Sequence, residues 1–352
     1  MPYYNNISVG NILQIQLLEV FLYKYNENGG SDVRLIDLHC DTITELRPGE
    51  SLSVNERMVN LSDLKEAQVL VQCCSMFVPT GLLGNAGIIE SECDRIYNTY
   101  QKEMKENAES VRKILTYDDI LACQEDGKTG IMLTIEDAGV LFGSQDAIFD
   151  MYHKGVRLIT LTWNHENELA YPNSDNYQLM NLGLKELGHI LVDRMFKIGM
   201  MVDVSHLSDG GFYDVADMAR RNGKPFVASH SNSREMCNHP RNMSDHMIHT
   251  LAECGGVMGL NLAPHFLSQT ESSNGYSRVE DMVRHVLHIR NVGGSEVLAI
   301  GSDFDGIEGR LEISKPTEFE KLWDALSKQG IPESEMDKMW QLNALRVFKD
   351  IL

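Results

Sequence analysis

Eight short runs of apolar and β-favouring residues recur along the chain, and each is followed by a segment with helical spacing or loop composition. The runs are continuously hydrophobic and lack the strict alternation of a half-buried strand. Continuous runs are typical of parallel strands that are buried on both faces of a sheet. The eight runs are Leu35–Leu38, Val69–Val78, Gly130–Ile135, Val156–Thr162, Met200–Ser205, Pro225–Ser229, Gly256–Leu262 and Val297–Ser302.

Helix-favouring segments fill most of the intervals between these runs. Ser208 and Ser244 each open such a segment, where a hydroxyl can accept a hydrogen bond from the first helical turn. The expected helical segments are Glu90–Leu115, Tyr177–Ile198, Ser208–Asn222, Ser244–Cys254, Glu280–Arg290, Glu318–Ser327 and Glu333–Leu352.

The alternation of strand and helix predicts an α/β fold, a (β/α)8 TIM barrel. A doubly wound open sheet is the alternative. The chain has 352 residues, a length that α/β barrels reach as one domain. We expect a single catalytic barrel over residues 34–352, including a C-terminal helix, and an N-terminal extension and linker over residues 1–33.

Polar residues with metal-binding side chains stand at the ends of five of the eight runs. The carboxyl ends of all strands of a barrel meet at one mouth, where barrel enzymes carry their chemistry. We therefore expect these side chains to gather there. They are His39 and Asp41 after the first run, Glu136 after the third, His206 after the fifth, His230 after the sixth and Asp303 after the eighth.

This combination of side chains points to a metal centre. His39 and Asp41 are two residues apart, so they lie on the same side of an extended strand and suit a borderline metal such as zinc. Several buried carboxylates at one mouth raise the free energy of the folded state unless a cation neutralises them. Two metal ions that share a carboxylate would do so. The fourth run ends without the lysine that bridges the metals in many barrel hydrolases, so Glu136 is the expected bridge.

Each residue also has an ordinary structural interpretation. A single histidine at a strand end is more often a core or surface residue than a ligand. Glu136 and Asp137 could begin a helix, where acids favour the helix dipole, and Asp303 could cap a turn. The coincidence at five strand ends is what favours the metal centre over these interpretations.

Charge and missing motifs narrow the class of protein. The chain carries 31 Lys and Arg against 51 Asp and Glu, a net charge of −20. This charge repels phosphate backbones and anionic membranes, so nucleic acid and membrane are not expected partners. The sequence lacks Walker, G-x-G-x-x-G and G-x-S-x-G motifs, which leaves serine-nucleophile hydrolysis without a candidate nucleophile.

The cysteines and the N-terminus favour a cytoplasmic protein. The seven cysteines are odd in number and irregular in spacing, which fits reduced thiols. The apolar segment from Ile12 to Tyr23 is interrupted by polar residues and is too short and polar to span a bilayer. We expect no secretion signal and no membrane anchor.

At the strand ends the sequence resembles the membrane dipeptidase (renal dipeptidase) family of zinc peptidases, in its bacterial form. The resemblance covers the chain from about residue 34 onward. Asn343–Phe348 is also similar to the family's C-terminal segment. The matching motifs are Asp37-Leu38-His39-Cys40-Asp41-Thr42, Glu136-Asp137, Asp203-Val204-Ser205-His206, Ser229-His230-Ser231, Arg241-Asn242 and Gly301-Ser302-Asp303-Phe304-Asp305-Gly306.

The resemblance implies specific roles for these residues. His39 and Asp41 would bind one zinc, His206 and His230 the other, and Glu136 both, with a water or hydroxide between the ions. Asp303 would be the acid and base that moves the proton from this water to the leaving amine. The resemblance also implies that Arg241 pairs with the C-terminal carboxylate of the substrate, for which a guanidinium is well shaped.

One position departs from the family pattern. The family often has a histidine directly after the Leu-Thr of the fourth strand, placed to hold the scissile carbonyl or its oxyanion. Trp163 occupies this position here, and the nearest histidine is His165. Either His165 reaches the substrate through a rebuilt loop, or the donor is missing and a zinc carries more of the oxyanion charge.

The expected function is therefore that of a metallo-dipeptidase, a hydrolase with two Zn2+ ions per chain. The resemblance suggests tolerance of a D-residue at the second position, some opening of β-lactam rings, and a homodimer. Two alternatives remain open at this stage. One is another amidohydrolase-type reaction on N-acyl amino acids or cyclic amides, and the other is a non-catalytic zinc-binding barrel.

Overall fold

The structure is a computed structural model that describes residues 33–269 and 275–352. Nearly all of the expected N-terminal extension, residues 1–32, lies outside the described residues. No helix in the described ranges combines the length and the apolar character that a membrane span requires.

Eight parallel strands close into a barrel, as the sequence predicts. They follow each other around the ring in the order β1-β2-β4-β5-β6-β7-β8-β10, and β10 pairs with β1 to complete it. Closure excludes the open sheet. The barrel strands are β1 (Leu35–Cys40), β2 (Val69–Phe77), β4 (Thr129–Glu136), β5 (Val156–Thr160), β6 (Met201–Asp203), β7 (Val227–Ala228), β8 (Val257–Leu260) and β10 (Leu298–Ile300).

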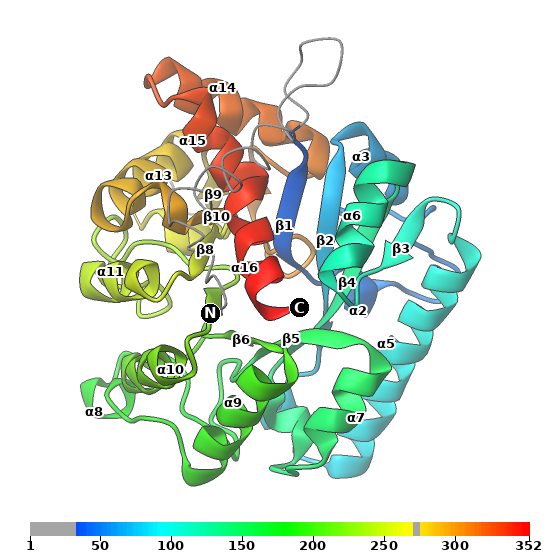
Figure 1. Ribbon diagram of the computed structural model, residues 1–352, viewed down its shortest axis with the longest axis vertical. Helices are drawn as coiled ribbons and strands as arrows, with labels where there is room; N and C mark the ends of the chain where they lie inside the picture. Colours follow the sequence, from blue (N-terminus) through cyan, green and yellow to red (C-terminus); the bar gives the residue numbers. More distant parts are fainter. Residues whose placement is uncertain (1–32, 270–274) are drawn as a thin grey trace, which may run out of the picture. The chain divides into compact units, whose positions relative to one another are not determined.

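Helices follow the strands and surround the ring (Figure 1). Ser208 and Ser244 cap two of them as expected, because their side chains accept hydrogen bonds from the N–H groups of Gly211 and Met247. The helices are α2 (Thr42–Glu45), α3 (Leu61–Glu66), α4 (Thr80–Leu83), α5 (Ala86–Glu106), α6 (Tyr117–Asp126), α7 (Ala147–Lys154), α8 (Tyr177–Met180), α9 (Glu186–Ile198), α10 (Asp209–Asn222), α11 (Asp245–Glu253), α12 (Pro264–Leu267), α13 (Val279–Gly293), α14 (Glu320–Lys328), α15 (Glu333–Asp337) and α16 (Asn343–Ile351).

The long helix expected over Glu90–Leu115 ends earlier than predicted. Helix α5 stops at Glu106, and a short strand β3 (Val111–Lys113) pairs with the first residues of β4. Val111, Ile114 and Leu115 have helical spacing in the sequence, which explains the wrong boundary. Pairing with β4 buries Val111, and this tertiary contact outweighs the local pattern.

Two other helical segments are interrupted. The segment Tyr177–Ile198 divides into α8 and α9, and the C-terminal segment contains a π-helical turn over Lys338–Leu342 between α15 and α16. A second small sheet pairs β9 (Tyr276–Ser277) with β11 (Arg310–Leu311). Three 3-10 helices complete the described elements; they are η1 (Ala138–Leu141), η3 (Ser295–Val297) and η4 (Pro316–Phe319).

Helix α16 covers the amino-terminal end of the barrel. Figure 1 shows it, in red, lying across the ring of strands. Arg346 donates a hydrogen bond to the carbonyl of Gly255, just before β8, and Asn343 donates to the carbonyls of Ser295 and Leu298 beside β10. Because α16 closes this end, the opposite end, where the carboxyl termini of the strands meet, is the one available for a ligand.

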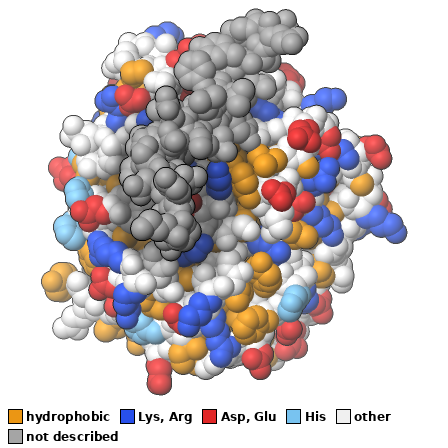
Figure 2. Space-filling model, viewed as in Figure 1, with side chains coloured by type: hydrophobic (Ala, Val, Ile, Leu, Met, Phe, Trp, Pro, Cys, Tyr) orange, Lys and Arg blue, Asp and Glu red, His pale blue; other side chains and the backbone are white. Residues whose placement is uncertain are grey.

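The charge of the chain is not gathered in one area of the view in Figure 2. Acidic and basic side chains are interspersed over the described part of this face. The negative net charge therefore does not form a single acidic patch on this side.

Candidate metal centre and active-site pocket

The six metal-binding and acidic side chains that the sequence singles out lie together at the carboxyl ends of the strands. Nε2 of His39 is 3.5 Å from Oδ2 of Asp41, 3.5 Å from Oε2 of Glu136 and 3.8 Å from Oδ1 of Asp303. The imidazoles of His39 and His230 are stacked, with ring centroids 3.8 Å apart. All these residues are buried.

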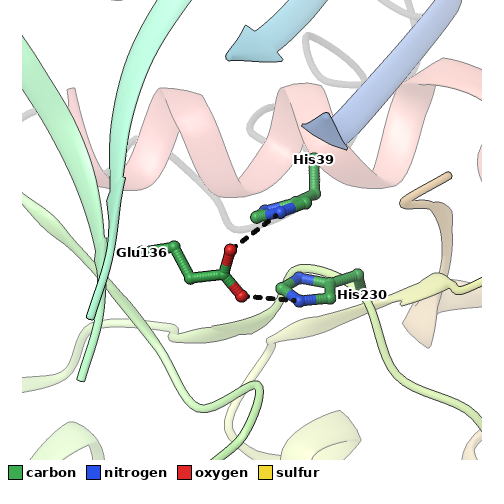
Figure 3. A group of neighbouring side chains, drawn as sticks. All are labelled: His39, Glu136 and His230. Atoms are coloured by element: carbon green, nitrogen blue, oxygen red, sulfur yellow. Dashed lines mark ion pairs between the residues drawn. The ribbon is translucent and has the colours of Figure 1, made fainter. Parts of the chain in front are cut away.

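The two carboxylate oxygens of Glu136 face different histidines. Oε2 lies 3.5 Å from Nε2 of His39, whereas Oε1 lies 2.9 Å from Nε2 of His206 and 3.4 Å from Nε2 of His230. Figure 3 shows the carboxylate between His39 and His230, with one oxygen directed at each. This arrangement is the one a bridging carboxylate needs.

Hydrogen bonds fix which nitrogen of two histidines is free. Nδ1 of His206 lies 3.0 Å from Oδ1 of Asn164, which can only accept, so Nδ1 carries the proton and Nε2 keeps its lone pair. Nδ1 of His230 lies 2.7 Å from Oγ of Ser229, which itself donates to Oδ2 of Asp203 at 2.6 Å. The same assignment therefore holds for His230.

The two free lone pairs face each other. Nε2 of His206 and Nε2 of His230 are only 3.2 Å apart, and both also face Oε1 of Glu136. Lone pairs and an anionic oxygen at this distance in a buried site repel one another unless a cation lies between them. The donor set therefore fits a metal ion.

Unpaired atoms of His39 and Asp41 point to the same conclusion. Neither ring nitrogen of His39 nor Oδ1 of Asp41 has a hydrogen-bond partner in the described part of the chain, although all three are buried. In a tetrahedral zinc site with bonds of about 2.0–2.2 Å, neighbouring ligand atoms are about 3.3 Å apart. The distances among these donor atoms are close to that spacing.

Two buried aspartates organise the backbone beneath the ligands. Asp37 accepts hydrogen bonds from the N–H and hydroxyl groups of Ser302 at 2.8 and 2.6 Å and from Gln72 at 3.0 Å. On the other side of the barrel, Asp203 accepts from the N–H and hydroxyl groups of Ser229 and from Thr160. Each aspartate thus joins a ligand-bearing strand to its neighbours.

His206 and Asp303 adopt left-handed backbone conformations, with φ of 67° and 63°. Non-glycine residues rarely adopt these angles, although His and Asp tolerate them better than most. The turn at each residue directs its side chain away from the strand and into the mouth. Two of the side chains that line the mouth therefore stand on strained backbone.

The buried environment lowers the pKa of His206 and raises the pKa of Asp303. Burial, with help from the nearby positive charge of Arg241, lowers the pKa of His206 to about 4. Burial raises the pKa of Asp303 to about 7, against the opposing effects of His39 and of a 2.8 Å hydrogen bond from Asn261 to Oδ2. Neutral His206 suits a metal ligand, and Oδ1 of Asp303 remains free to exchange a proton.

Arg241 is buried beside the metal-binding side chains. It donates to Oγ of Ser231 at 3.0 Å and to the carbonyl of His230 at 2.9 Å, and its Nε is unpaired among the described residues. Its guanidinium lies 5.6 Å from the ring of Phe266. No Asp or Glu of the described ranges is within ion-pair distance of Arg241, although a buried guanidinium normally has an anionic partner.

A cavity of about 500 Å³ opens above the metal centre. Trp163 and Asn164 line it, whereas His165 does not. The His165 side chain packs against α4, so closely that a Cβ atom on Gly81 would be 2.4 Å from it. Asp41, Glu136, His206 and Asp303 lie on the cavity surface. Arg241 is not among the lining residues, but its guanidinium is close to the lining residue Phe266.

Sequence reasoning missed the residues that support the ligands. Asn261 is the one polar residue within the apolar run Gly256–Leu262, and this isolation is a signal that could have identified it. Asn164 and Ser229 carry no comparable signal, because asparagine and serine are common at strand ends. Only the folded arrangement joins them to His206 and His230.

A barrel with histidines and carboxylates gathered at its mouth defines a metal-dependent hydrolase. The sequence model of the family described as membrane dipeptidase (peptidase family M19) matches residues 30–352. The chain therefore belongs to the membrane dipeptidase family, whose members are metallo-dipeptidases, as its motifs predict.

Curated relatives are similar to the chain over about two thirds of its length. The chain is 31% identical over 251 residues to an uncharacterized protein in the pqqA 5′ region of Klebsiella pneumoniae, covering 70% of this chain and 90% of that protein. It is 32% identical over 237 residues to an uncharacterized dipeptidase of Schizosaccharomyces pombe, covering 66% of this chain and 55% of that protein. The chain thus spans only about half the length of the yeast relative.

Solved structures have the same fold. A dipeptidase described as a metallopeptidase of family M19 superposes with a TM-score of 0.81 at 22% identity, covering 91% of this chain and 98% of that one. The probable dipeptidase PvdM from Pseudomonas aeruginosa gives a TM-score of 0.81 at 17% identity, covering 96% and 98%. A metallopeptidase from Rhodobacter sphaeroides, solved with a phosphinate mimic of L-Ala-D-Ala, gives 0.80 at 21% identity, covering 91% and 99%.

Proposed function

We propose that this chain is a zinc-dependent dipeptidase that holds two Zn2+ ions bridged by Glu136. The proposal rests mainly on the position of the Glu136 carboxylate. One of its oxygens faces His39, and the other faces His206 and His230. In this proposal Asp41 joins His39 at the first ion. When bound, such an ion pair supplies an activated water and polarises a carbonyl group.

Asp303 is the proposed acid and base. Asn261 holds its Oδ2, so Oδ1 is the oxygen that takes a proton from the attacking water and returns it to the leaving amine. A proton carrier works best when its pKa is near the working pH and its position is fixed. Asn261 supplies that position.

Arg241 is the proposed partner of the substrate's C-terminal carboxylate. Its guanidinium uses one hydrogen bond on each terminal nitrogen, which leaves further N–H groups for an anion. The lack of an acidic partner in the described ranges supports this role, because a bound carboxylate would neutralise the buried charge. A fixed distance between Arg241 and Glu136 would restrict the enzyme to very short peptides.

The role considered for His165 requires a change in the loop that follows β5. In the structure His165 packs against α4, and Trp163 faces the cavity in its place. An H165A variant separates the two possibilities. A fall in kcat of about 10²-fold or more would indicate that His165 acts as an oxyanion donor, since removal of such a donor lowers kcat by about this factor.

The test of the function is hydrolysis of L,L and L,D dipeptides by metal-stripped enzyme, with and without added zinc. We expect hydrolysis of both classes in the presence of zinc and loss of both with chelator. N-acyl amino acids and cyclic amides serve as competitors in the panel. Turnover of these alone would indicate another amidohydrolase-type reaction, and zinc binding without any turnover would indicate a non-catalytic barrel.

We propose separately that the protein forms a homodimer and that it is cytoplasmic. The family expectation of a homodimer is tested by the molar mass in solution. Neither bears on the chemistry, because every residue assigned above belongs to one chain.

A further inference from the structure

The active-site cavity has an aromatic wall made by Phe77 and Trp163. Their ring centroids are 5.1 Å apart and the ring planes are inclined by 59°. Both residues line the cavity of about 500 Å³ above the metal ligands, and both are partly exposed to it. The two rings therefore form one apolar side of the cavity.

The wall is held in place from the side away from the cavity. The ring of His165 lies against Trp163, with centroids 5.8 Å apart, and packs on Gly81 at the start of α4. No hydrogen bond to the indole of Trp163 is present among the described residues. Trp163 therefore offers its ring as an apolar surface, and aromatic surfaces of this kind favour flat or bulky apolar partners.

The order of the strands sets the position of this wall relative to Arg241. Arg241 follows β7, whereas Phe77 ends β2 and Trp163 follows β5, with β4 and Glu136 between them. Around the closed ring, β4 is three strands from β7 in one direction and five in the other. Strand β2 is four strands from β7 in either direction, so Phe77 lies across the ring from Arg241. Trp163, which follows β5, lies two strands from β7 and packs against Phe77.

We propose that Phe77 and Trp163 form the subsite for the side chain of the substrate's N-terminal residue, and that they select large apolar residues, above all aromatic ones. The inference rests on the proposed dipeptidase function. A dipeptide whose carboxylate meets Arg241 and whose peptide carbonyl reaches Glu136 directs its N-terminal residue across the ring. That residue then meets the aromatic wall.

The test compares kcat/KM for Phe-Ala, Leu-Ala and Gly-Ala in zinc-loaded enzyme. For the native protein we expect Phe-Ala to be preferred over Gly-Ala by at least about tenfold, a typical effect of filling an apolar pocket. W163A should reduce this ratio about fivefold or more, whereas W163F should keep most of it. Y177A is the control, because Tyr177 is an aromatic residue on α8 that is 81% exposed and does not line the cavity.

Selectivity distinguishes this role from a purely structural one. A variant that only loosens the loop would lower kcat/KM for all dipeptides alike and would lower zinc content or thermal stability. An unchanged Phe-Ala to Gly-Ala ratio in W163A would overturn the inference, and so would an equal loss for all substrates in W163F. Hydrolysis without selectivity defeats this inference alone, whereas absence of any dipeptide hydrolysis defeats the proposed function itself.

Discussion

Single hydrogen bonds to the ligand histidines determine how well the site is prepared for metal. Oγ of Ser229 accepts a hydrogen bond from Nδ1 of His230 and donates one to Oδ2 of Asp203. We expect S229A to weaken zinc binding about 10- to 100-fold without unfolding the protein, the usual effect of removing such a supporting partner. Zinc affinity is measured by competition with a chromogenic chelator.

Ser75 provides the matched control for that substitution. It is also a buried serine on a barrel strand, but its hydroxyl has no partner in the described part of the chain. S75A should therefore leave zinc affinity unchanged. Equal affinities for S229A and S75A would contradict the role given to Ser229.

Gly306 permits a close approach that no other residue allows. A Cβ atom at this position would be 2.1 Å from Oδ2 of Asp41 and 2.6 Å from Oδ1 of Asp303. We expect G306A to displace both carboxylates and to lose most zinc and most activity. G87A in α5, where an added Cβ meets nothing closer than 3.4 Å, should keep both. Full zinc content in G306A, measured by atomic absorption, would show that the site tolerates the displacement.

Removal of the ionisable group at Asp303 separates metal binding from turnover. D303N keeps the shape of the side chain but cannot accept and return a proton. We expect zinc content to persist and kcat to fall about 10²- to 10⁴-fold, the range typical of general acid–base groups. D150N, an exposed change on α7, is the control. Near-native turnover in D303N would exclude Asp303 as the proton carrier.

At the scale of elements, His285 in α13 connects two loops of the mouth. Its Nδ1 accepts from the N–H of Ser233, after β7, and its Nε2 donates to the carbonyl of Leu267 at the end of α12. Burial lowers the pKa of His285 to about 4. The folded state therefore holds this histidine neutral at a pH where the unfolded chain binds a proton.

This shift makes stability depend on pH in a known direction. The unfolded pKa is near 6.5, so the contribution of His285 is complete above that pH and is lost as the pH falls toward about 4. At 1.36 kcal/mol per pKa unit the loss is up to about 3 kcal/mol. H285Q should flatten this acid dependence in urea titrations from pH 7 to 4, relative to the exposed-site control H153Q on α7. Parallel curves for H285Q and the native protein would contradict it.

The sequence predicted the strands better than the helix boundaries. Eight continuous apolar runs coincide with the eight barrel strands because each strand is buried on both faces. Local spacing predicts helix over residues 107–115, but Val111 pairs with Thr129 in a sheet, a contact that local spacing cannot reveal. The π-helical turn at Lys338–Leu342 likewise has no local signal.

The same distinction applies to the site. His39, Glu136 and Asp303 could be predicted to meet because parallel strands in a barrel share one mouth. The direction of His165, away from the cavity, could not be predicted, because it depends on packing against Gly81 in helix α4, which follows another strand. Supporting residues such as Asn164 depend on contacts of the same kind.

At the scale of the whole molecule, one end of the barrel contributes to stability and the other holds the metal-binding side chains. Phe348 of α16 is fully buried at the amino-terminal end, whereas the metal ligands occupy the carboxyl-terminal end. We expect F348A to lower the free energy of unfolding by about 3–5 kcal/mol, as for other large-to-small changes in cores. Zinc stoichiometry of the folded variant should not change. K328A on α14, an exposed change, should alter neither quantity.

The most direct measurement is dipeptide hydrolysis by metal-stripped enzyme as zinc is added in known equivalents. The account predicts no hydrolysis without metal, full activity only at two zinc ions per chain, and failure of E136Q to reach it at the same stoichiometry. Hydrolysis that survives complete removal of metal, or that reaches its maximum at one equivalent, would contradict the bridged metal pair.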